Sequence, residues 1–263
     1  MKKVTVNTLL QYKQQQEKFS CLTSYDASFA AMANEAGIDV LLVGDSLGNV
    51  IQGLDTTIPV TIEQMCYHTR CVAAGNSRAL IVADMPFMAH MEKSTAIKSA
   101  TALMQAGAHM IKMECGRWQS DIVTTLVRGG IPVCIHIGLT PQTVNTLGGF
   151  KVQGREEQKA EALIEDAIAL EAAGAQLIVM ECVPSALAKK IDDSVKIPTI
   201  GIGAGIETTG QVLVVYDMLG FNKHPAKFVR NFMLEAGSIQ DAFAAYHNAV
   251  KSRTFPGSEH CFN

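Results

Sequence analysis

Short apolar segments recur along the chain, and each ends in a polar residue. The clearest example is Val40-Leu41-Leu42-Val43, which is followed by Gly44, Asp45 and Ser46. A run without polar alternation is typical of a strand buried on both faces, and it predicts a parallel sheet covered by helices. The same pattern recurs in four further segments, which end in Asp84, Glu114, His136 and Glu181. In parallel α/β folds, polar groups at the carboxyl ends of strands indicate a ligand site.

The spacing of these segments predicts the architecture. Strands are expected at 19–23, 40–43, 80–84, 110–114, 131–136, 177–181, 197–205 and 212–215, each but the last followed by a helix or a loop and a helix. About eight such units in 263 residues predict an α/β protein with a single (β/α)8 TIM-type barrel domain over 1–263. An amphipathic helix at about 5–17 is expected to cover the bottom of the barrel, and a helix and tail occupy about 228–263.

Two glycine-rich segments interrupt this pattern. Residues 138–155 are too long for a plain connection, and we expect them to cover a site. The string Gly201-Ile202-Gly203-Ala204-Gly205 follows the seventh strand, where barrels often bind phosphate. We favour the interpretation that these glycines only permit a tight turn of the strand end.

Composition narrows the possible partners. The chain is 48% hydrophobic and 18% charged, which suggests that part of its surface is covered in a homo-oligomer. A net charge of -3, without a basic run, argues against nucleic acid as a partner. No apolar run of about 18 residues indicates a membrane segment, so we expect no membrane association. Seven scattered cysteines without a Cys-x-x-Cys pair indicate free thiols and a cytoplasmic protein.

Three carboxylates define a candidate metal site. Asp45, Asp84 and Glu114 end the second, third and fourth strands, so barrel closure should bring them together. Crowded carboxylates repel unless a cation joins them, and oxygen-only ligands favour Mg²⁺, with one ion per subunit. The alternative is that each carboxylate caps the following helix. Lys112 shares a strand face with Glu114, so it could neutralise a substrate carboxylate or form an internal ion pair.

Two further groups could handle protons. His136 could ligate the metal, shuttle a proton or donate a hydrogen bond to a substrate oxygen, or it could be an ordinary barrel histidine. Glu181 lies across the predicted barrel from the carboxylates and is a candidate base, with pairing to Lys189 as the alternative. A cation beside a base suits one reaction class: the carbonyl of a 2-oxo acid is polarised while the adjacent carbon loses a proton. The carbanion then attacks a carbon electrophile.

Several strings together identify a resemblance that covers nearly the whole chain. They are Thr23-Ser24-Tyr25-Asp26, Val43-Gly44-Asp45-Ser46-Leu47-Gly48, Ala83-Asp84-Met85-Pro86-Phe87, His136-Ile137-Gly138-Leu139-Thr140-Pro141-Gln142, Gly149-Phe150-Lys151-Val152-Gln153-Gly154-Arg155, Glu181-Cys182-Val183-Pro184 and 201–205. In these strings the chain resembles the ketopantoate hydroxymethyltransferase family. The resemblance implies a barrel of the phosphoenolpyruvate/pyruvate kind, assembled as a homodecamer.

The resemblance also implies a reaction and residue roles. The expected enzyme transfers a hydroxymethyl group from 5,10-methylenetetrahydrofolate, its co-substrate, to 3-methyl-2-oxobutanoate (α-ketoisovalerate). The product is 2-dehydropantoate (ketopantoate), in the first step of pantothenate and coenzyme A synthesis. By matching position, Asp45, Asp84 and Glu114 resemble the Mg²⁺ site, and Glu181 resembles the proton acceptor. With the arguments above, the substrate contacts expected are Asp45, Ser46, Asp84, Lys112 and His136.

The sequence departs from the family pattern at two positions. Cys115-Gly116 stands where the family usually has two glycines, and Thr209-Gly210-Gln211 stands where it usually has Asp-Gly-Gln.

Two rival functions remain open. A Mg²⁺-dependent lyase or mutase acting on a 2-oxo acid would use the same barrel, but such enzymes usually carry a Lys-Lys-Cys-Gly-His-like string, and this sequence has none. A non-catalytic binding or assembly barrel is the second rival.

Overall fold

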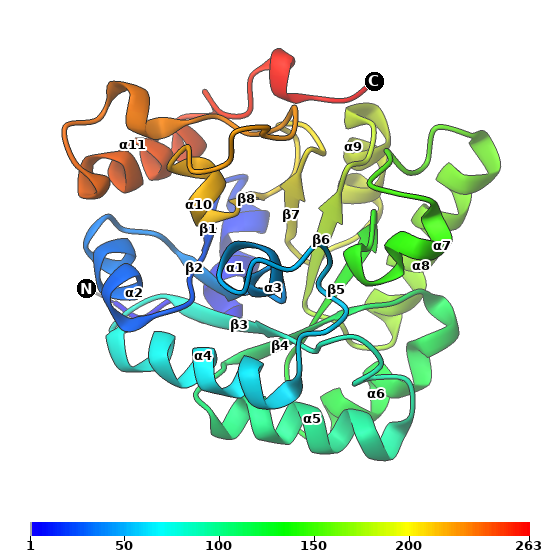
Figure 1. Ribbon diagram of the computed structural model, residues 1–263. Helices are drawn as coiled ribbons and strands as arrows, with labels where there is room; N and C mark the ends of the chain where they lie inside the picture. The colour runs from blue at the N-terminus through cyan, green and yellow to red at the C-terminus, as the bar shows by residue number, and fades with distance from the viewer. Residues whose placement is uncertain (1) are drawn as a thin grey trace.

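Eight parallel strands form a closed barrel in the computed structural model, which describes residues 2–263 (Figure 1). The strands follow one another around the barrel in chain order, and β8 pairs with β1. They are β1 Phe19–Thr23, β2 Val40–Val43, β3 Leu80–Asp84, β4 Met110–Glu114, β5 Val133–Gly138, β6 Leu177–Glu181, β7 Thr199–Ile202 and β8 Gly210–Leu213. The predicted (β/α)8 barrel is confirmed.

Helices surround the barrel (Figure 1). The longer ones are α1 Val6–Gln15, α2 Ala27–Glu35, α4 Ile62–Gly75, α5 Lys93–Gln105, α6 Ser120–Arg128, α8 Glu157–Ala172, α9 Ser185–Ser194 and α11 Ile239–Lys251. Short α-helical turns are α3 Leu47–Val50, α7 Val144–Leu147 and α10 Val215–Met218, and the 3₁₀ turns are η1 Arg117–Gln119, η2 Pro141–Thr143, η3 Phe232–Glu235 and η4 Ser258–His260.

The hydrophobic core has two layers, because successive side chains of a strand point to opposite faces of the sheet. One layer lies between the strands and the outer helices and includes Leu41, Ile81 and Ile111. The other fills the barrel interior. It contains Leu9 of α1 together with Phe19 of β1, so α1 covers the amino-terminal end of the barrel as expected.

The connection from β7 to β8 departs from the prediction. Residues 203–209 cross between the two strands without a helix, and β8 begins at Gly210, two residues before the predicted strand. Gly203 and Gly205 have positive φ angles, and a Cβ at Gly203 would lie 2.8 Å from Phe228 and 3.0 Å from Phe262. The carboxyl-terminal segment therefore packs against this turn. The tight-turn interpretation of the glycine string fits this packing.

Strand register places the polar groups at one end of the barrel. Asp84, Glu114 and Glu181 are the last residues of β3, β4 and β6. Asp84 pairs in register with Lys112, and Glu114 pairs with His136. None of the helices described is long and apolar enough to cross a membrane.

Candidate active site

The predicted carboxylates and Lys112 meet at the mouth of the barrel. Asp45 follows β2, and its backbone N–H donates to Asp84 Oδ2 at 3.1 Å. Lys112 Nζ donates to Asp84 Oδ1 at 2.6 Å, so the lysine pairs with Asp84 and the alternative of an ion pair with Glu114 is wrong. All three side chains are buried. Three strands thus contribute to one charged cluster.

Glu114, His136 and Glu181 continue this cluster across β4, β5 and β6. His136 Nδ1 lies 3.7 Å from Glu114 Oε1, and His136 Nε2 lies 3.4 Å from Glu181 Oε2. Both ring nitrogens are buried without a hydrogen-bond partner within residues 2–263. The imidazole therefore stands between two carboxylates and keeps both nitrogens available. Glu181 is not paired with Lys189, which instead contacts Asp193 at 2.7 Å.

The helix-capping alternative for the carboxylates is also wrong. The residues at the capping positions are Ser46 for α3, Glu92 for α5 and Gly116 for η1. Asp84 instead accepts hydrogen bonds from the Asp45 backbone N–H and from Lys112. Asp45 and Glu114 accept hydrogen bonds from Gln142. This arrangement is typical of a functional cluster.

Gln142 completes the cluster, and the predicted set of site residues did not include it. Its side-chain amide donates to Asp45 Oδ2 at 2.8 Å and to the Met85 carbonyl at 3.0 Å. Its backbone N–H donates to Glu114 Oε2 at 3.0 Å. Gln142 belongs to η2, inside the loop predicted to cover a site, so that loop orients two of the three carboxylates. A glutamine in a long loop carries no signal of this role without the fold.

Burial and like charge dominate the electrostatics. Burial, and then the Asp84 carboxylate, raise the pKa of Asp45 to about 7. Burial, and then Asp45, raise the pKa of Glu114 well above its usual range. Burial opposes the charged form of Lys112, but Asp84, Asp45 and Glu114 together raise its pKa. Burial, and then Lys112, lower the pKa of His136, so this imidazole is neutral at pH 7.

The donor set fits a hard divalent cation. Three buried carboxylates face a single ammonium group, and the raised pKa values of Asp45 and Glu114 indicate a site at which further positive charge would be stabilised. In the described part of the chain, no three His, Cys, Asp or Glu side chains are already arranged as a metal-binding group. Mg²⁺ usually takes one or two carboxylates and completes its shell with water and substrate oxygens, so it does not require such a group.

Ser46 lies beside the carboxylates and contacts the connection between β1 and α2. Its Oγ is 2.8 Å from the Tyr25 hydroxyl. A Cβ at Gly44 would lie 2.7 Å from this Oγ and 3.7 Å from Asp84 Oδ2, so only glycine leaves room for both groups. Packing therefore requires a glycine immediately before Asp45 and Ser46.

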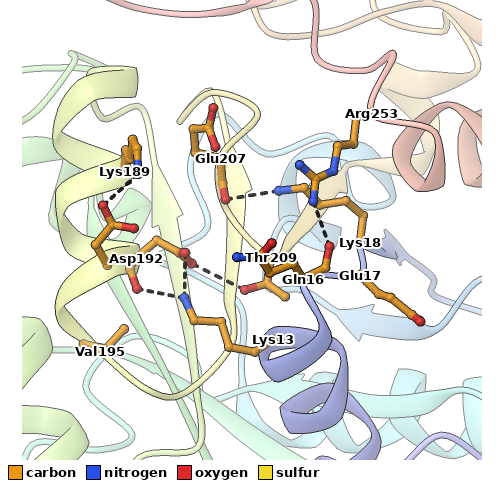
Figure 2. A pocket seen from close by; sticks show the side chains of 11 residues that line it. Lys13, Gln16, Glu17, Lys18, Lys189, Asp192, Val195, Glu207, Thr209 and Arg253 are labelled. Atoms are coloured by element: carbon orange, nitrogen blue, oxygen red, sulfur yellow. Dashed lines mark hydrogen bonds and ion pairs between the residues drawn. The ribbon is translucent and has the colours of Figure 1, made fainter.

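A cavity outside the carboxylate cluster lies at the opposite end of the barrel (Figure 2). Its volume is about 430 Å³, and its lining side chains come from α1, α9, the residues that follow these helices, the segment between β7 and β8, and Arg253 after α11. Its cations already have partners: Lys13 contacts Asp192 at 2.6 Å, and Lys18 Nζ donates to three backbone carbonyls. We assign the chemistry to the mouth.

Comparison with known proteins identifies the family of the chain. Residues 3–258 match the family model described as ketopantoate hydroxymethyltransferase. The chain belongs to this family. The sequence is 58% identical over 260 residues to a 3-methyl-2-oxobutanoate hydroxymethyltransferase of Marinobacter nauticus, covering 98% of each chain. It is 55% identical over 262 residues to that of Photorhabdus laumondii, covering 100% of each. The predicted hydroxymethyltransferase family and enzyme class are confirmed.

Solved structures with the same fold are more distant. A phosphonopyruvate hydrolase has a TM-score of 0.62 at 12% identity, covering 80% of each chain. A 2,3-dimethylmalate lyase, described as a PEP mutase/isocitrate lyase superfamily member, has a TM-score of 0.56 at 15% identity, covering 82% of each chain. These likenesses concern the fold alone, which this hydroxymethyltransferase family member shares with these proteins.

Proposed function

We propose that the chain transfers a hydroxymethyl group from 5,10-methylenetetrahydrofolate to 3-methyl-2-oxobutanoate, giving 2-dehydropantoate for pantothenate synthesis. The observation that carries this proposal is the pairing of a buried carboxylate cluster with Glu181 across His136, in a chain of the ketopantoate hydroxymethyltransferase family. The names of the relatives support this substrate. They favour it over a lyase or mutase reaction on the same barrel.

Asp45, Asp84 and Glu114 would hold Mg²⁺, directly or through water. When bound, the ion supplies a Lewis acid for the carbonyl of the 2-oxo acid. Raised pKa values at Asp45 and Glu114 support this assignment, because a cation there would stabilise the ionised carboxylates.

The chain's own side chains perform the remaining steps. The Lys112 ammonium and the Ser46 hydroxyl bind the oxo acid and fix its orientation. Glu181 accepts the C3 proton. Neutral His136, whose Nε2 lies 3.4 Å from Glu181 Oε2, has a single N–H and donates it to a substrate oxygen. The C3 electron pair then forms a carbon–carbon bond with the folate methylene carbon as one of its two carbon–nitrogen bonds breaks. Water displaces the second folate nitrogen, so that the water oxygen becomes the new hydroxyl group. The C3 proton and one proton of the water end on the two folate nitrogens, and tetrahydrofolate leaves.

Purified chain, Mg²⁺, 3-methyl-2-oxobutanoate and 5,10-methylenetetrahydrofolate should together yield 2-dehydropantoate, measured by mass spectrometry. Chelation of the metal with EDTA should abolish formation of the product, and added Mg²⁺ should restore it. Absence of product from folded protein would refute the proposed activity. Cleavage of a 2-oxo acid in the same assay would support a lyase instead. If the folded protein catalysed neither reaction, the result would support the non-catalytic binding barrel.

We also propose a cytoplasmic homo-oligomer, a homodecamer by family resemblance, acting on small molecules. Seven free cysteines support a reducing compartment. Exposed apolar side chains such as Leu234 and Phe221, at 82% and 66% exposed, support contacts between copies. Light scattering from the purified chain measures the number of copies.

A further inference from the structure

A second pocket adjoins the barrel mouth outside the carboxylate cluster. It has a volume of about 220 Å³ and lies between η1, η2 and α8. Residues that line it include Glu114, Gly116, Trp118, Gly138, Leu163 and Asp166. Glu114 belongs to the carboxylate cluster, and Gly138 pairs in register with Glu181. The pocket therefore borders the ends of the strands that carry the proposed base and the metal-side glutamate.

The floor of this pocket is kept open by Gly116. A Cβ at Gly116 would lie 3.1 Å from the Cδ1 and Nε1 atoms of Trp118 and 3.3 Å from Asp166 Oδ2. An indole N–H and a carboxylate oxygen thus border the same small space. The backbone at Gly116 has φ -124° and ψ -179°, which any residue adopts, so glycine is not needed there for its conformation.

The groups around this space match a planar amino-heterocycle. Asp166 Oδ1 accepts from the Arg117 backbone N–H at 3.1 Å, whereas within residues 2–263 no hydrogen bond reaches Oδ2. The Trp118 side chain is 66% exposed and offers an aromatic face for stacking. A carboxylate oxygen beside an aromatic face suits a ring with adjacent N–H and amino donors.

We propose that this pocket binds the pterin ring of the folate co-substrate, with Trp118 stacking on the ring and Asp166 accepting from its 2-amino and N3–H groups. This proposal rests on the proposed function, which supplies the folate. Ligand pockets for drug-sized molecules usually have about 300 to 1,000 Å³, so a 220 Å³ pocket accommodates one ring system and leaves the rest of the folate outside.

Trp118 is the only tryptophan of the chain, so its fluorescence reports directly on this pocket. Titration of the wild-type chain with 5-formyltetrahydrofolate, in the presence of Mg²⁺ and 3-methyl-2-oxobutanoate, should quench the emission of Trp118. Asp166→Asn should weaken binding about 10- to 100-fold, because a charge-assisted acceptor is lost. Gly116→Ala should weaken binding as well, because its Cβ enters the floor of the pocket.

Asp121→Asn is the matched control. Asp121 lies on the neighbouring α6, exposed and paired with Lys93 at 3.0 Å, away from the pocket. It should bind 5-formyltetrahydrofolate as the wild type does. All variants should retain exchange of the C3 proton of the oxo acid, because that step needs no folate.

The outcomes separate this proposal from the proposed function. Wild-type affinity for the folate in both Asp166→Asn and Gly116→Ala would overturn the pocket assignment, as would binding without any change in Trp118 emission. If the wild type still formed 2-dehydropantoate, the proposed activity would stand without this pocket. If the wild type formed no product, the proposed activity would fail, whatever the pocket binds.

Discussion

Glu181→Gln is expected to abolish exchange of the C3 proton of 3-methyl-2-oxobutanoate with deuterated solvent, with a loss of about 10² to 10⁴-fold. The amide keeps the size of the side chain but cannot accept the proton. Binding of the oxo acid should persist, because its proposed contacts, Lys112 and Ser46, are unchanged. Proton NMR in deuterium oxide measures the exchange, and calorimetry measures the binding.

Two comparisons make this experiment decisive. Glu207→Gln, at an exposed position on the β7–β8 connection, should leave exchange unchanged. His136→Asn removes the imidazole that lies 3.4 Å from Glu181. If exchange survived in Glu181→Gln and disappeared in His136→Asn, the histidine would be the base, and the proposed role of Glu181 would be abandoned.

Asp84→Asn is expected to weaken Mg²⁺ binding more than about 100-fold, since even residues that only support metal ligands cost about 10- to 100-fold. Asp84 also accepts from Lys112 at 2.6 Å and from the Asp45 N–H at 3.1 Å. Loss of one partner of a buried ion pair costs about 3 to 5 kcal/mol. Asp45 and Glu114 still face Lys112, so we expect a smaller loss and a folded chain.

Isothermal titration with Mg²⁺ and unfolding in urea separate the two effects. Asp39→Asn is the control: Asp39 is fully buried and pairs with Arg78 at 2.9 Å, but it precedes β2 at the other end of the barrel. It should lose stability and keep Mg²⁺ binding. Wild-type Mg²⁺ affinity in Asp84→Asn would remove Asp84 from the metal site.

Most strands could be predicted from sequence because they are short, mainly apolar runs that end in a polar residue. The segments that end in Asp84, Glu114 and Glu181 were bounded correctly, since a run of buried residues that stops at a carboxylate marks both the strand and its carboxyl end. The β7–β8 connection was less predictable. Glycines at 201, 203 and 205 blur the end of a strand, and the segment that packs on them, around Phe228 and Phe262, lies far along the chain.

The pairing of charges could not be settled by spacing. Lys112 and Glu114 share a strand face, yet the ammonium group contacts Asp84, because register places the neighbouring strand's last residue directly opposite Lys112. Gln142 and Asp166 were not singled out for the same reason. Their roles depend on where a loop and an outer helix pack against the barrel, and a glutamine or an aspartate in the sequence does not indicate that packing.

By itself the sequence determined the barrel, its family and the list of acidic, basic and imidazole groups at its mouth. Each apolar strand and the polar residue that ends it are neighbours in the sequence, so this pattern can be recognised without the fold. Only the tertiary structure decided which group contacts which. Closure of the barrel fixes the strand register, and the register sets the distances between Asp84 and Lys112 and between His136 and Glu181. Those distances, a few ångströms in a buried setting, decide which groups interact strongly and so what chemistry the site can perform.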